Sequence, residues 1–349
     1  MKQYITYMDK CIELARLGTG EVSPNPLVGC IIINSNNEII ATGYHKKYGE
    51  NHAERDALLK LENAKNCTLF VNLEPCSHFG KTPPCADLII EKGIKTVVYG
   101  MKDPNPIVSG KGLQKLKEAG IEIIGPILED QCKKLNEVFI KNHTQKKTFV
   151  ALKTATTIDG KIATRTNDSK WITSTAAREE VRNIRKKYDA ILTSSATVIA
   201  DNPTMEHKRK IILDRKLKTN IESKIYQQGE IFIFYDENLT PPKNANINYI
   251  PTPVKNEKLD IKYILNALYE LKIMSIFVEA GGEVNNSFLP YIDKLYHFIA
   301  PKILGDNSGK SCFYGKEIEK ISDCTNLNFD EFIPYPPDIL ITYTKNQTH

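Results

Sequence analysis

The sequence lacks any hydrophobic run long enough to cross a membrane. No apolar stretch approaches the roughly 18–20 residues that a transmembrane helix needs. The opening residues 1–18 also lack the continuous apolar core and small-residue cleavage site of a secretory signal. They predict an amphipathic helix instead, with Met8, Cys11, Ile12 and Ala15 on one face. We therefore expect a cytoplasmic protein that does not bind membranes.

Cysteine is too scarce for a disulfide scaffold, and internal repeats and low-complexity tracts are missing. Eight cysteines in 349 residues are expected to be free or metal-bound in a reducing compartment. The 41% of hydrophobic and 26% of charged residues are typical of a soluble globular protein. The net charge of +5 comes from scattered lysines, which indicate solvated surfaces more than an anionic partner.

The length and the pattern of elements indicate two α/β domains. The first half alternates strands with helices, which favours helices on both faces of one sheet. Its expected strands are 27–33, 38–44, 67–73, 96–100 and 121–125, with helices at 53–61, just before Gly93 and at 110–120. The polar, lysine-rich stretch 140–148 predicts a linker. Strands then resume at 149–156, 189–195, 210–214, 230–235 and 275–280.

His52, Cys76 and Cys85 provide the ligands of a catalytic zinc site, which keeps three protein ligands and leaves the fourth position to water. Glu54 is left as a proton carrier. Residues at i and i+2 do not share a face in mid-helix, so His52 and Glu54 must lie at a helix start. Cys85 follows two prolines and is expected to begin a helix, whose N-terminus favours its thiolate.

Two other interpretations of these residues stay open. The first is a closed structural zinc knot with His78 as the fourth ligand, which leaves Glu54 without a role. The second is a set of buried cysteines without a metal. The presence of H-x-E before Pro-Cys and a second Cys favours the open, catalytic site.

The segments "HAE" and "PCSHFGKTPPC" resemble the zinc-dependent cytidine deaminase superfamily, whose signature is H-x-E followed by P-C-x-x-C. Residues 77–84 between the cysteines make a longer loop, which is similar to that of the pyrimidine deaminase of riboflavin biosynthesis, as are "SPNPLVG" and "DPNPIVSGKG". The second half resembles the riboflavin-pathway reductase through "ALKTATTIDGKIA", "SKWIT", "TSSATVIADNP" and "VEAGGEVNNSFL". The chain is identified as a member of the bifunctional bacterial deaminase–reductase family.

The resemblance implies a cytidine deaminase-like three-layer α/β/α domain over 1–145 and a dihydrofolate reductase-like α/β domain over 146–349. No G-x-G-x-x-G follows a strand, so a Rossmann domain is not expected. The implied first reaction is zinc-dependent hydrolytic deamination of a diaminopyrimidinone ribosyl phosphate, with Glu54 as general acid–base. The second is reduction of the ribosylamino group to a ribityl chain by NADPH.

The resemblance also implies the substrate contacts of the deaminase, which are Asn25, Lys81, Asp103 and Asn105. Asn25 lies between two prolines, and Asp103 and Asn105 belong to an Asp-Pro-Asn-Pro segment. Both patterns are equally typical of rigid turns. The turn interpretation therefore stays open.

For the reductase, the resemblance implies one set of cofactor contacts and one of substrate contacts. The cofactor residues are Ala155, Trp171, Thr197, Asp201, Gly281, Gly282, Glu283, Val284, Asn285, Asn286 and Ser287. The substrate residues are Lys153, Ser169, Arg185, Met205, Lys208 and Glu279. Lys153, Asp201 and Glu279 are expected nearest the reacting carbon. The two glycines let a ligand approach the backbone, although Gly-Gly between strand and helix is also an ordinary tight turn.

One segment departs from the family pattern. "DNPTMEHKR" has Met205 in place of the family's Leu and Lys208 in place of its Arg. Lysine keeps the charge but loses the two-pronged grip of arginine on phosphate. Arg209 is a candidate replacement.

Two other classes of protein remain as alternatives. A nucleic-acid deaminase uses the same zinc site but needs a basic, aromatic surface for the strand, which is not evident here. A zinc-stabilised binding module would leave Glu54 without function. We expect phosphorylated pyrimidines as the partners, no nucleic acid, and a homo-oligomer.

Overall fold

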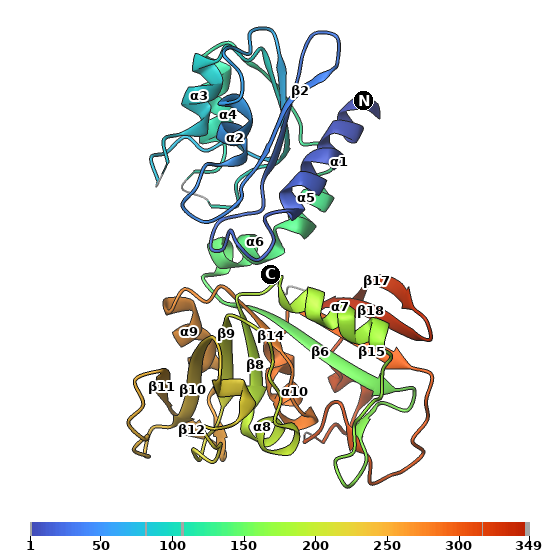
Figure 1. Cartoon of the computed structure of the whole chain (residues 1–349). Coiled ribbons are helices and arrows are strands. Elements are labelled where there is room, and N and C mark those ends of the chain that lie inside the picture. The colour runs from blue at the N-terminus through green and yellow to red at the C-terminus, as the bar shows by residue number, and fades with distance from the viewer. Residues whose placement is uncertain (1, 81, 106–107, 316, 346–349) are drawn as a thin grey trace. The chain divides into compact units, whose positions relative to one another are not determined.

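The chain forms two compact units, Met1–Lys146 and Lys147–His349. Figure 1 shows the computed structural model, which describes residues 2–80, 82–105, 108–315 and 317–345. Both units are α/β, as expected from the sequence. Within the described ranges, none of the helices combines the length and the hydrophobicity required to cross a bilayer.

The first unit is built on a five-stranded sheet with the order β2-β1-β3-β4-β5. The strands are β1 (Gly29–Ile33), β2 (Ile39–Tyr44), β3 (Thr68–Leu73), β4 (Thr96–Met101) and β5 (Glu122–Ile124). β1 is antiparallel to β2 and β3, whereas β3, β4 and β5 are parallel. β1 and β4 are buried along their whole length because helices cover both faces of the sheet.

Helices lie on both faces of this sheet, which gives the three layers expected from the sequence (Figure 1). One face carries α1 (Lys2–Arg16) and α5 (Glu129–Leu135), and the other carries α2 (Ala53–Leu58), α3 (Cys85–Glu91) and α4 (Lys111–Glu118). The predicted apolar face of α1 is confirmed, since Met8, Cys11, Ile12 and Ala15 are all buried. Helix α2 ends at Leu58, earlier than the predicted Leu61.

The predicted linker over 140–148 is wrong for most of its length, because α6 (Glu137–Gln145) occupies it. The residues that α6 buries are polar, Lys141 and Asn142. A helix with polar residues at its buried positions shows no hydrophobic period, so the sequence pattern did not reveal it. Lys146, in the left-handed region, ends the helix.

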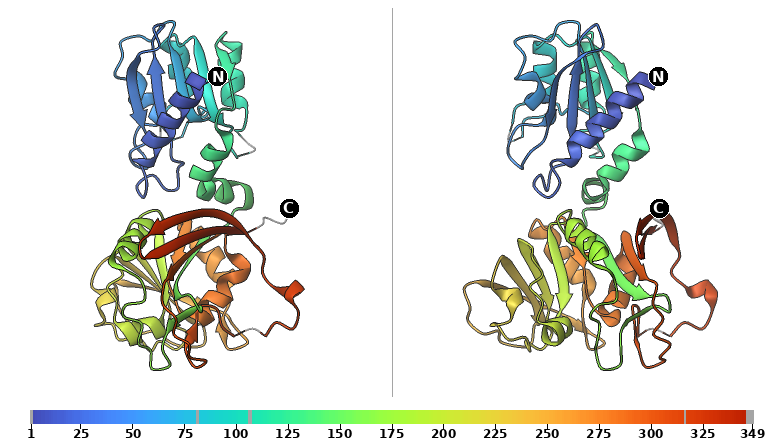
Figure 2. Two further views of the ribbon diagram at one scale, coloured as in Figure 1. Left: turned by 90° about the vertical axis from the view of Figure 1, so that its right-hand side faces the viewer. Right: turned by 45° about the vertical axis from the view of Figure 1, so that its right-hand side comes forward.

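The second unit contains a nine-stranded sheet with the order β11-β10-β9-β8-β14-β6-β15-β18-β17. The strands are β6 (Phe149–Thr157), β8 (Ala190–Ser194), β9 (Arg209–Leu213), β10 (Glu230–Asp236), β11 (Ile247–Thr252), β14 (Ser275–Val278), β15 (Lys294–Ala300), β17 (Leu327–Tyr335) and β18 (Asp338–Lys345). The sheet is parallel from β11 to β15, and β18 and β17 extend it antiparallel. Figure 2 shows this final pair as a long curved ribbon.

Hydrophobic cores lie on both faces of this sheet because alternate residues of each strand point to opposite sides. On one face, Leu192 and Phe234 pack with Ile264 of α9 (Ile261–Glu270). On the other, Ile191 and Ile212 pack with Val198 of α8 (Ser195–Asp201). The remaining helices are α7 (Thr175–Arg185) and α10 (Gly282–Phe288), and short strands pair as β7 (Lys161–Ala163) with β16 (Lys310–Ser311) and β12 (Val254–Lys255) with β13 (Lys258–Leu259).

Candidate active sites in the two units

The ligand atoms of His52, Cys76 and Cys85 lie within 4.8 Å of one another in the first unit. His52 is the N-cap of α2, and Cys85 is the first residue of α3, as the sequence predicts. Cys76 lies in the loop after β3, and its sulfur accepts the Cys85 backbone N–H at 3.3 Å. Two helix starts and a loop thus converge on one point. The structure also describes His78, and this residue lies outside the group. Its position argues against a closed four-ligand knot.

The distances between these atoms fit a tetrahedral zinc ion. Nδ1 of His52 lies 3.6 Å from Sγ of Cys76 and 3.5 Å from Sγ of Cys85. Zinc bonds of about 2.3 Å to sulfur and about 2.0 Å to nitrogen, at a tetrahedral angle, separate the two ligand atoms by about 3.5 Å. The chemistry of the donor set fits as well, since imidazole and thiolate are the ligands that zinc prefers. Nδ1 is therefore the candidate ligand atom of His52.

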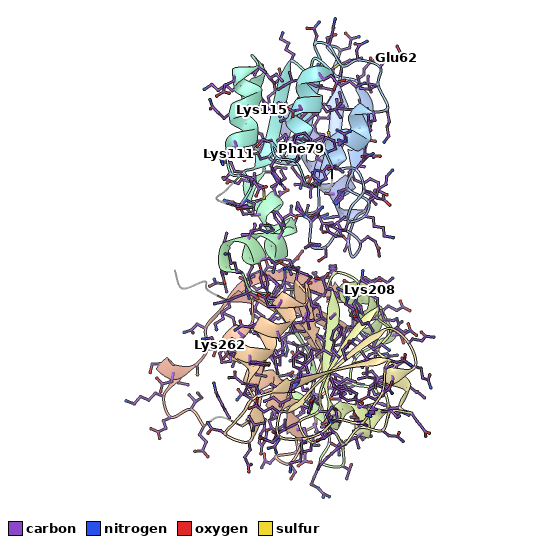
Figure 3. The ribbon with its side chains drawn as sticks, turned by 90° about the vertical axis from the view of Figure 1, so that its left-hand side faces the viewer. Glu62, Phe79, Lys111, Lys115, Lys208 and Lys262 are labelled. Atoms are coloured by element: carbon purple, nitrogen blue, oxygen red, sulfur yellow. The ribbon has the colours of Figure 1, made fainter. Side chains whose placement is uncertain are left out.

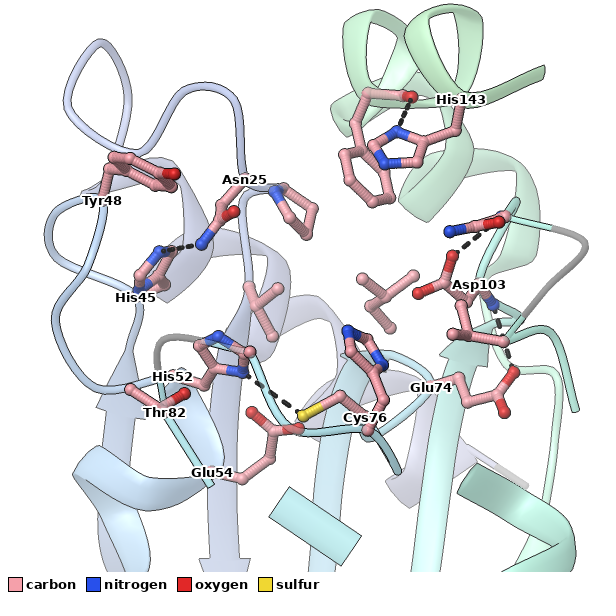
Figure 4. A pocket seen from close by; sticks show the side chains of 18 of the residues that line it. Asn25, His45, Tyr48, His52, Glu54, Glu74, Cys76, Thr82, Asp103 and His143 are labelled. Atoms are coloured by element: carbon pink, nitrogen blue, oxygen red, sulfur yellow. Dashed lines mark hydrogen bonds between the residues drawn. The ribbon is translucent and has the colours of Figure 1, made fainter. Parts of the chain in front are cut away.

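Glu54 is buried beside the three ligands, with 3% of its surface exposed. Figure 4 shows its carboxyl group next to the sulfur of Cys76. Burial, together with the negative charge of Cys76, raises the pKa of Glu54 to about 7. A carboxyl group that titrates near neutrality can both accept and release a proton at cellular pH, which is what a general acid–base needs.

Without a metal, the pKa values of the two cysteine thiols are shifted in opposite directions. A hydrogen bond from the thiol of Cys85 lowers the pKa of Cys76, and the same bond raises the pKa of Cys85. This hydrogen bond therefore favours the thiolate form of Cys76 over that of Cys85. A bound zinc ion requires both as thiolates, so metal binding at this site releases a proton.

A cavity of about 270 Å³ opens above Glu54 and His52. Its wall includes three of the predicted substrate residues, Asn25, Asp103 and Asn105. The Asp103 carboxylate accepts the backbone N–H of Asn105 at 2.8 Å, and burial raises the pKa of Asp103. The fourth predicted residue, Lys81, lies outside the described residues.

Residues that sequence reasoning missed also line this cavity, among them His45. His45 contacts Nδ2 of Asn25 through Nε2 at 3.1 Å, and its Nδ1 faces the Asn51 carbonyl at 3.0 Å. Because a carbonyl only accepts, Nδ1 carries the proton and Nε2 accepts from the Asn25 amide. Burial lowers the pKa of His45, which favours this neutral form. The segment "GYH" before the H-x-E motif was the available signal.

Helix α6 supplies two more missed residues, Phe139 and His143, of which His143 is labelled in Figure 4. Their ring centroids are 4.1 Å apart, and Nδ1 of His143 bonds to the Phe139 carbonyl at 3.0 Å. The segment taken for a linker is thus part of the cavity wall. No sequence signal marked these residues, because their helix was not predicted.

In the second unit, three predicted substrate residues form a partly buried ion cluster. Nε of Arg185 is 2.6 Å from Oε1 of Glu279, and Nζ of Lys153 is 3.7 Å from Oε2. They come from α7, the end of β14 and β6 respectively. Burial opposes ionisation of Glu279, but the charges of Arg185 and Lys153 outweigh it and lower its pKa. Burial lowers the pKa of Lys153 despite the attraction of Glu279.

A cavity of about 710 Å³ lies in the same unit, within the range of roughly 300–1,000 Å³ that is typical of ligand sites. Five predicted cofactor residues line it, namely Gly281, Gly282, Glu283, Val284 and Ser287. A Cβ atom at Gly281 would meet nothing within 4 Å, so the cavity reaches the bare backbone there. A Cβ atom at Gly282 would lie 2.2 Å from the Ser311 carbonyl, so this glycine is required by packing. These features fit a cofactor held close to the main chain.

The other six predicted cofactor residues, all of them described by the structure, do not line this cavity. They are Ala155, Trp171, Thr197, Asp201, Asn285 and Asn286. Trp171 is 61% exposed and stacks under the Arg178 guanidinium, with 4.4 Å between that group and the ring centroid. Asp201 ends α8 with an exposed side chain, and its carboxylate is not among the described groups that contact Glu279. Asn285 is buried and donates to the Cys312 carbonyl.

The segment that departs from the family pattern has both buried and exposed residues. Met205 is buried in the core beside α8, with 7% of its surface exposed. Lys208 is exposed (Figure 3), and Arg209 pairs with Glu230 at 3.0 Å. The candidate replacement for the family's arginine is thus already engaged in an ion pair. Ser169 is half-buried.

Comparisons with known families agree with the two halves. The family described as "Cytidine and deoxycytidylate deaminase zinc-binding region" matches residues 1–101. The family described as "RibD C-terminal domain" matches residues 148–341. The fold and the two sites thus define a zinc-binding deaminase joined to a reductase.

Full-length relatives extend this assignment. The riboflavin biosynthesis protein RibD of Bacillus amyloliquefaciens is 38% identical over 98% of this chain and 96% of the relative. RibD of Escherichia coli is 34% identical over 96% and 97%. The structure of Acinetobacter baumannii RibD has a TM-score of 0.88 and 33% identity, and covers 99% of both chains. The crystal structure of a deaminase/reductase from Thermotoga maritima has a TM-score of 0.89 and 38% identity, and also covers 99% of both.

The chain belongs to the RibD family of riboflavin biosynthesis. The family, the fold and the pairing of a deaminase with a reductase predicted from the sequence are therefore confirmed. Zinc and NADPH, the expected cofactors, are those of this family.

Proposed function

We propose that His52, Cys76 and Cys85 hold zinc and that Glu54 moves protons during deamination of a diaminopyrimidinone ribosyl phosphate. The observation that carries this assignment is the pair of Nδ1–Sγ distances, 3.6 and 3.5 Å, beside a buried carboxyl group. The Thermotoga maritima relative is described as a diaminohydroxyphosphoribosylaminopyrimidine deaminase and 5-amino-6-(5-phosphoribosylamino)uracil reductase, which supports the same substrates here.

When bound, zinc lowers the pKa of its water toward neutrality and so supplies hydroxide at cellular pH. Glu54 would take one proton from that water and give it to a ring nitrogen of the base as the oxygen adds to the amine-bearing carbon. It would then take the second proton from the new hydroxyl group on that carbon and give it to the amino group, which leaves as ammonia. Its pKa near 7 supports both directions of transfer. Asn25, fixed by His45, would bind an edge of the base, and Asp103 and Asn105 would bind from the opposite wall.

We propose that the second unit reduces the deaminated product at the ion cluster of Lys153, Arg185 and Glu279. When bound, NADPH supplies the hydride that opens the ribosyl group. The cavity of about 710 Å³ beside Gly281 would hold the cofactor. The cluster can orient a substrate, because Glu279 offers acceptor oxygens and Lys153 offers a donor whose pKa is lowered by burial.

The proposal extends to the partners of the chain. We propose that it acts on free phosphorylated pyrimidines in the cytoplasm, without nucleic acid, and that it self-associates. The edge strand β17 supports self-association, because Phe329 and Phe332 are 65% and 53% exposed. Light scattering of the purified protein measures its mass and tests this part separately.

The central experiment follows the two reactions independently. The zinc-loaded protein is incubated with the diamino substrate, with and without NADPH, and ammonia release and NADPH absorbance are recorded in parallel. Ammonia release without NADPH, followed by NADPH oxidation on its addition, is expected. A zinc-stabilised binding module would give neither signal, and a nucleic-acid deaminase would release ammonia only from a polynucleotide.

A further inference from the structure

Glu74 is a buried carboxylate in the wall of the deaminase cavity, and the proposed reactions assign it no role. It follows β3 directly and precedes Pro75 and the ligand Cys76, and 5% of its surface is exposed. Its side chain accepts four backbone N–H groups. Oε2 accepts those of Asp103 at 3.2 Å and Gly110 at 2.9 Å, and Oε1 accepts those of Gly112 at 3.0 Å and Leu113 at 3.4 Å.

These contacts make Glu74 a helix cap supplied from another part of the chain. The first N–H groups of an α-helix have no partner within the helix, and a side chain at the N-cap usually binds them. The N-cap of α4 is Gly110, which has no side chain to do so. The Glu74 carboxylate supplies the acceptor that Gly110 lacks. Hydrogen bonds to a charged acceptor are about twice as strong as neutral ones.

The same carboxylate also fixes a wall of the deaminase cavity. It binds the backbone of Asp103, whose own carboxylate binds the backbone N–H of Asn105 at 2.8 Å. Figure 4 shows Glu74 below Asp103 on this side of the cavity. Close packing holds the other end, because a Cβ atom at Gly112 would lie 1.9 Å from the Pro75 carbonyl.

We propose that Glu74 is a positioning residue for substrate binding by the deaminase. It ties Asp103 and the start of α4 to the segment that carries Cys76, and so sets the distance between the substrate-binding wall and the zinc ligands. This inference rests on the proposed function, which makes Asp103 and Asn105 substrate contacts. It adds that their placement depends on one carboxylate of the cavity wall, whose oxygens are already bound to backbone N–H groups.

The test is Glu74→Gln in the full-length, zinc-loaded protein. Glutamine keeps the shape but turns one acceptor oxygen into an NH₂ donor, which faces N–H groups and repels them. Losing hydrogen bonds to a charged acceptor should raise KM for the diamino substrate about tenfold or more, with kcat changed less than about threefold. Zinc content and NADPH oxidation with the deaminated substrate should be unchanged.

The matched control is Asp87→Asn, which neutralises an exposed carboxylate of α3 that pairs with Lys115 of α4. It should leave KM unchanged. An unchanged KM in Glu74→Gln would overturn the proposal. Loss of zinc in parallel with loss of deamination would also overturn it, because Glu74 would then serve the metal segment and not the substrate wall.

A second measurement needs no variant and does not depend on the substrate. In the wild-type protein, the amides of Gly112 and Leu113 should exchange with deuterium slowly, although first-turn amides ordinarily lack an acceptor. Fast exchange of both would refute the cap even if Glu74→Gln fails to fold. If no deamination is observed at all, the proposed function fails, while slow exchange at these amides would still support the positioning contact.

Discussion

Nδ1 of His52 and Sγ of Cys85 are 3.5 Å apart, although each residue stands at the start of a different helix. The backbone N–H of Cys85 also donates to Sγ of Cys76, so each of the three candidate ligands contacts the other two. Replacing the Cys85 side chain removes one candidate ligand and the thiol that hydrogen-bonds to Cys76, whereas the backbone N–H of residue 85 remains.

Cys85→Ser should bind greatly reduced zinc and lose deamination. Serine is a poor zinc ligand at neutral pH because its hydroxyl stays protonated. Metal analysis after dialysis measures the loss. Cys324→Ser, which changes an exposed cysteine of the other unit, should keep full zinc and activity. Full zinc retention by Cys85→Ser would disprove the assignment of this ligand.

Glu54→Gln should keep its fold and its zinc but lose deamination by at least about 10²-fold, since general acid–base groups contribute on the order of 10²–10⁴ in rate. The amide still forms hydrogen bonds but carries no proton between atoms. Ammonia release under saturating substrate measures the effect. Glu62→Gln, at an exposed position (Figure 3), is the control and should behave as wild type. Near-normal turnover of Glu54→Gln would rule out the mechanism.

Glu279→Ala should abolish NADPH oxidation and destabilise the second unit. Removing the carboxylate leaves Arg185 and Lys153 facing each other while both are mostly buried. Breaking a buried pair by removing one partner costs about 3 kcal/mol or more. Calorimetry measures the stability, and Glu270→Ala at an exposed site of α9 serves as the control. Deamination should persist, and a parallel loss of both activities would contradict the separation of the sites.

A fragment spanning 147–349 should fold, bind NADPH and reduce the deaminated substrate. Its cores involve only residues of the second unit, and about 200 residues suffice to bury a stable core. NADPH absorbance with the purified fragment measures its activity. A folded fragment that binds NADPH without oxidising it would mean that reduction requires the first unit.

Asp159 should make the free energy of unfolding of the second unit depend on pH in the acidic range. Its carboxylate accepts the Thr157 hydroxyl and the backbone N–H groups of Leu304 and Gly305, which together lower its pKa to about 2. Because the folded pKa lies below the unfolded one, its stabilisation is present above about pH 4 and is lost as the pH falls toward 2. The melting temperature of Asp159→Asn should therefore lie below that of wild type at pH 7, and the difference should shrink in acid. A difference that is constant with pH would contradict this origin.

The sequence predicted the three candidate zinc ligands because chemistry restricts such ligands to few residue types. It predicted α1 from the period of its buried residues, and β1 and β4 from short continuous hydrophobic runs. It failed where polar residues are buried. Lys141 and Asn142 lie on the inward face of α6, and Lys294 is buried at the start of the unpredicted strand β15. The segment "GYH" marks His45 in the sequence, but its tautomer depends on the Asn51 carbonyl, which only the fold brings beside it.

Three apolar clusters of the described residues each belong to a single unit. The apolar cluster of Ile32, Phe70 and Val98 belongs to the first unit, and the clusters around Phe234 and Ile212 belong to the second. In genetic terms, defects in the two halves should fall into different complementation groups. A cell that carries one chain with Glu54→Gln and another with Glu279→Gln would retain one intact copy of each half, and the deaminated intermediate released by the Glu279→Gln chain could diffuse to the Glu54→Gln chain. Selection can therefore act on either half of the gene without first repairing the other.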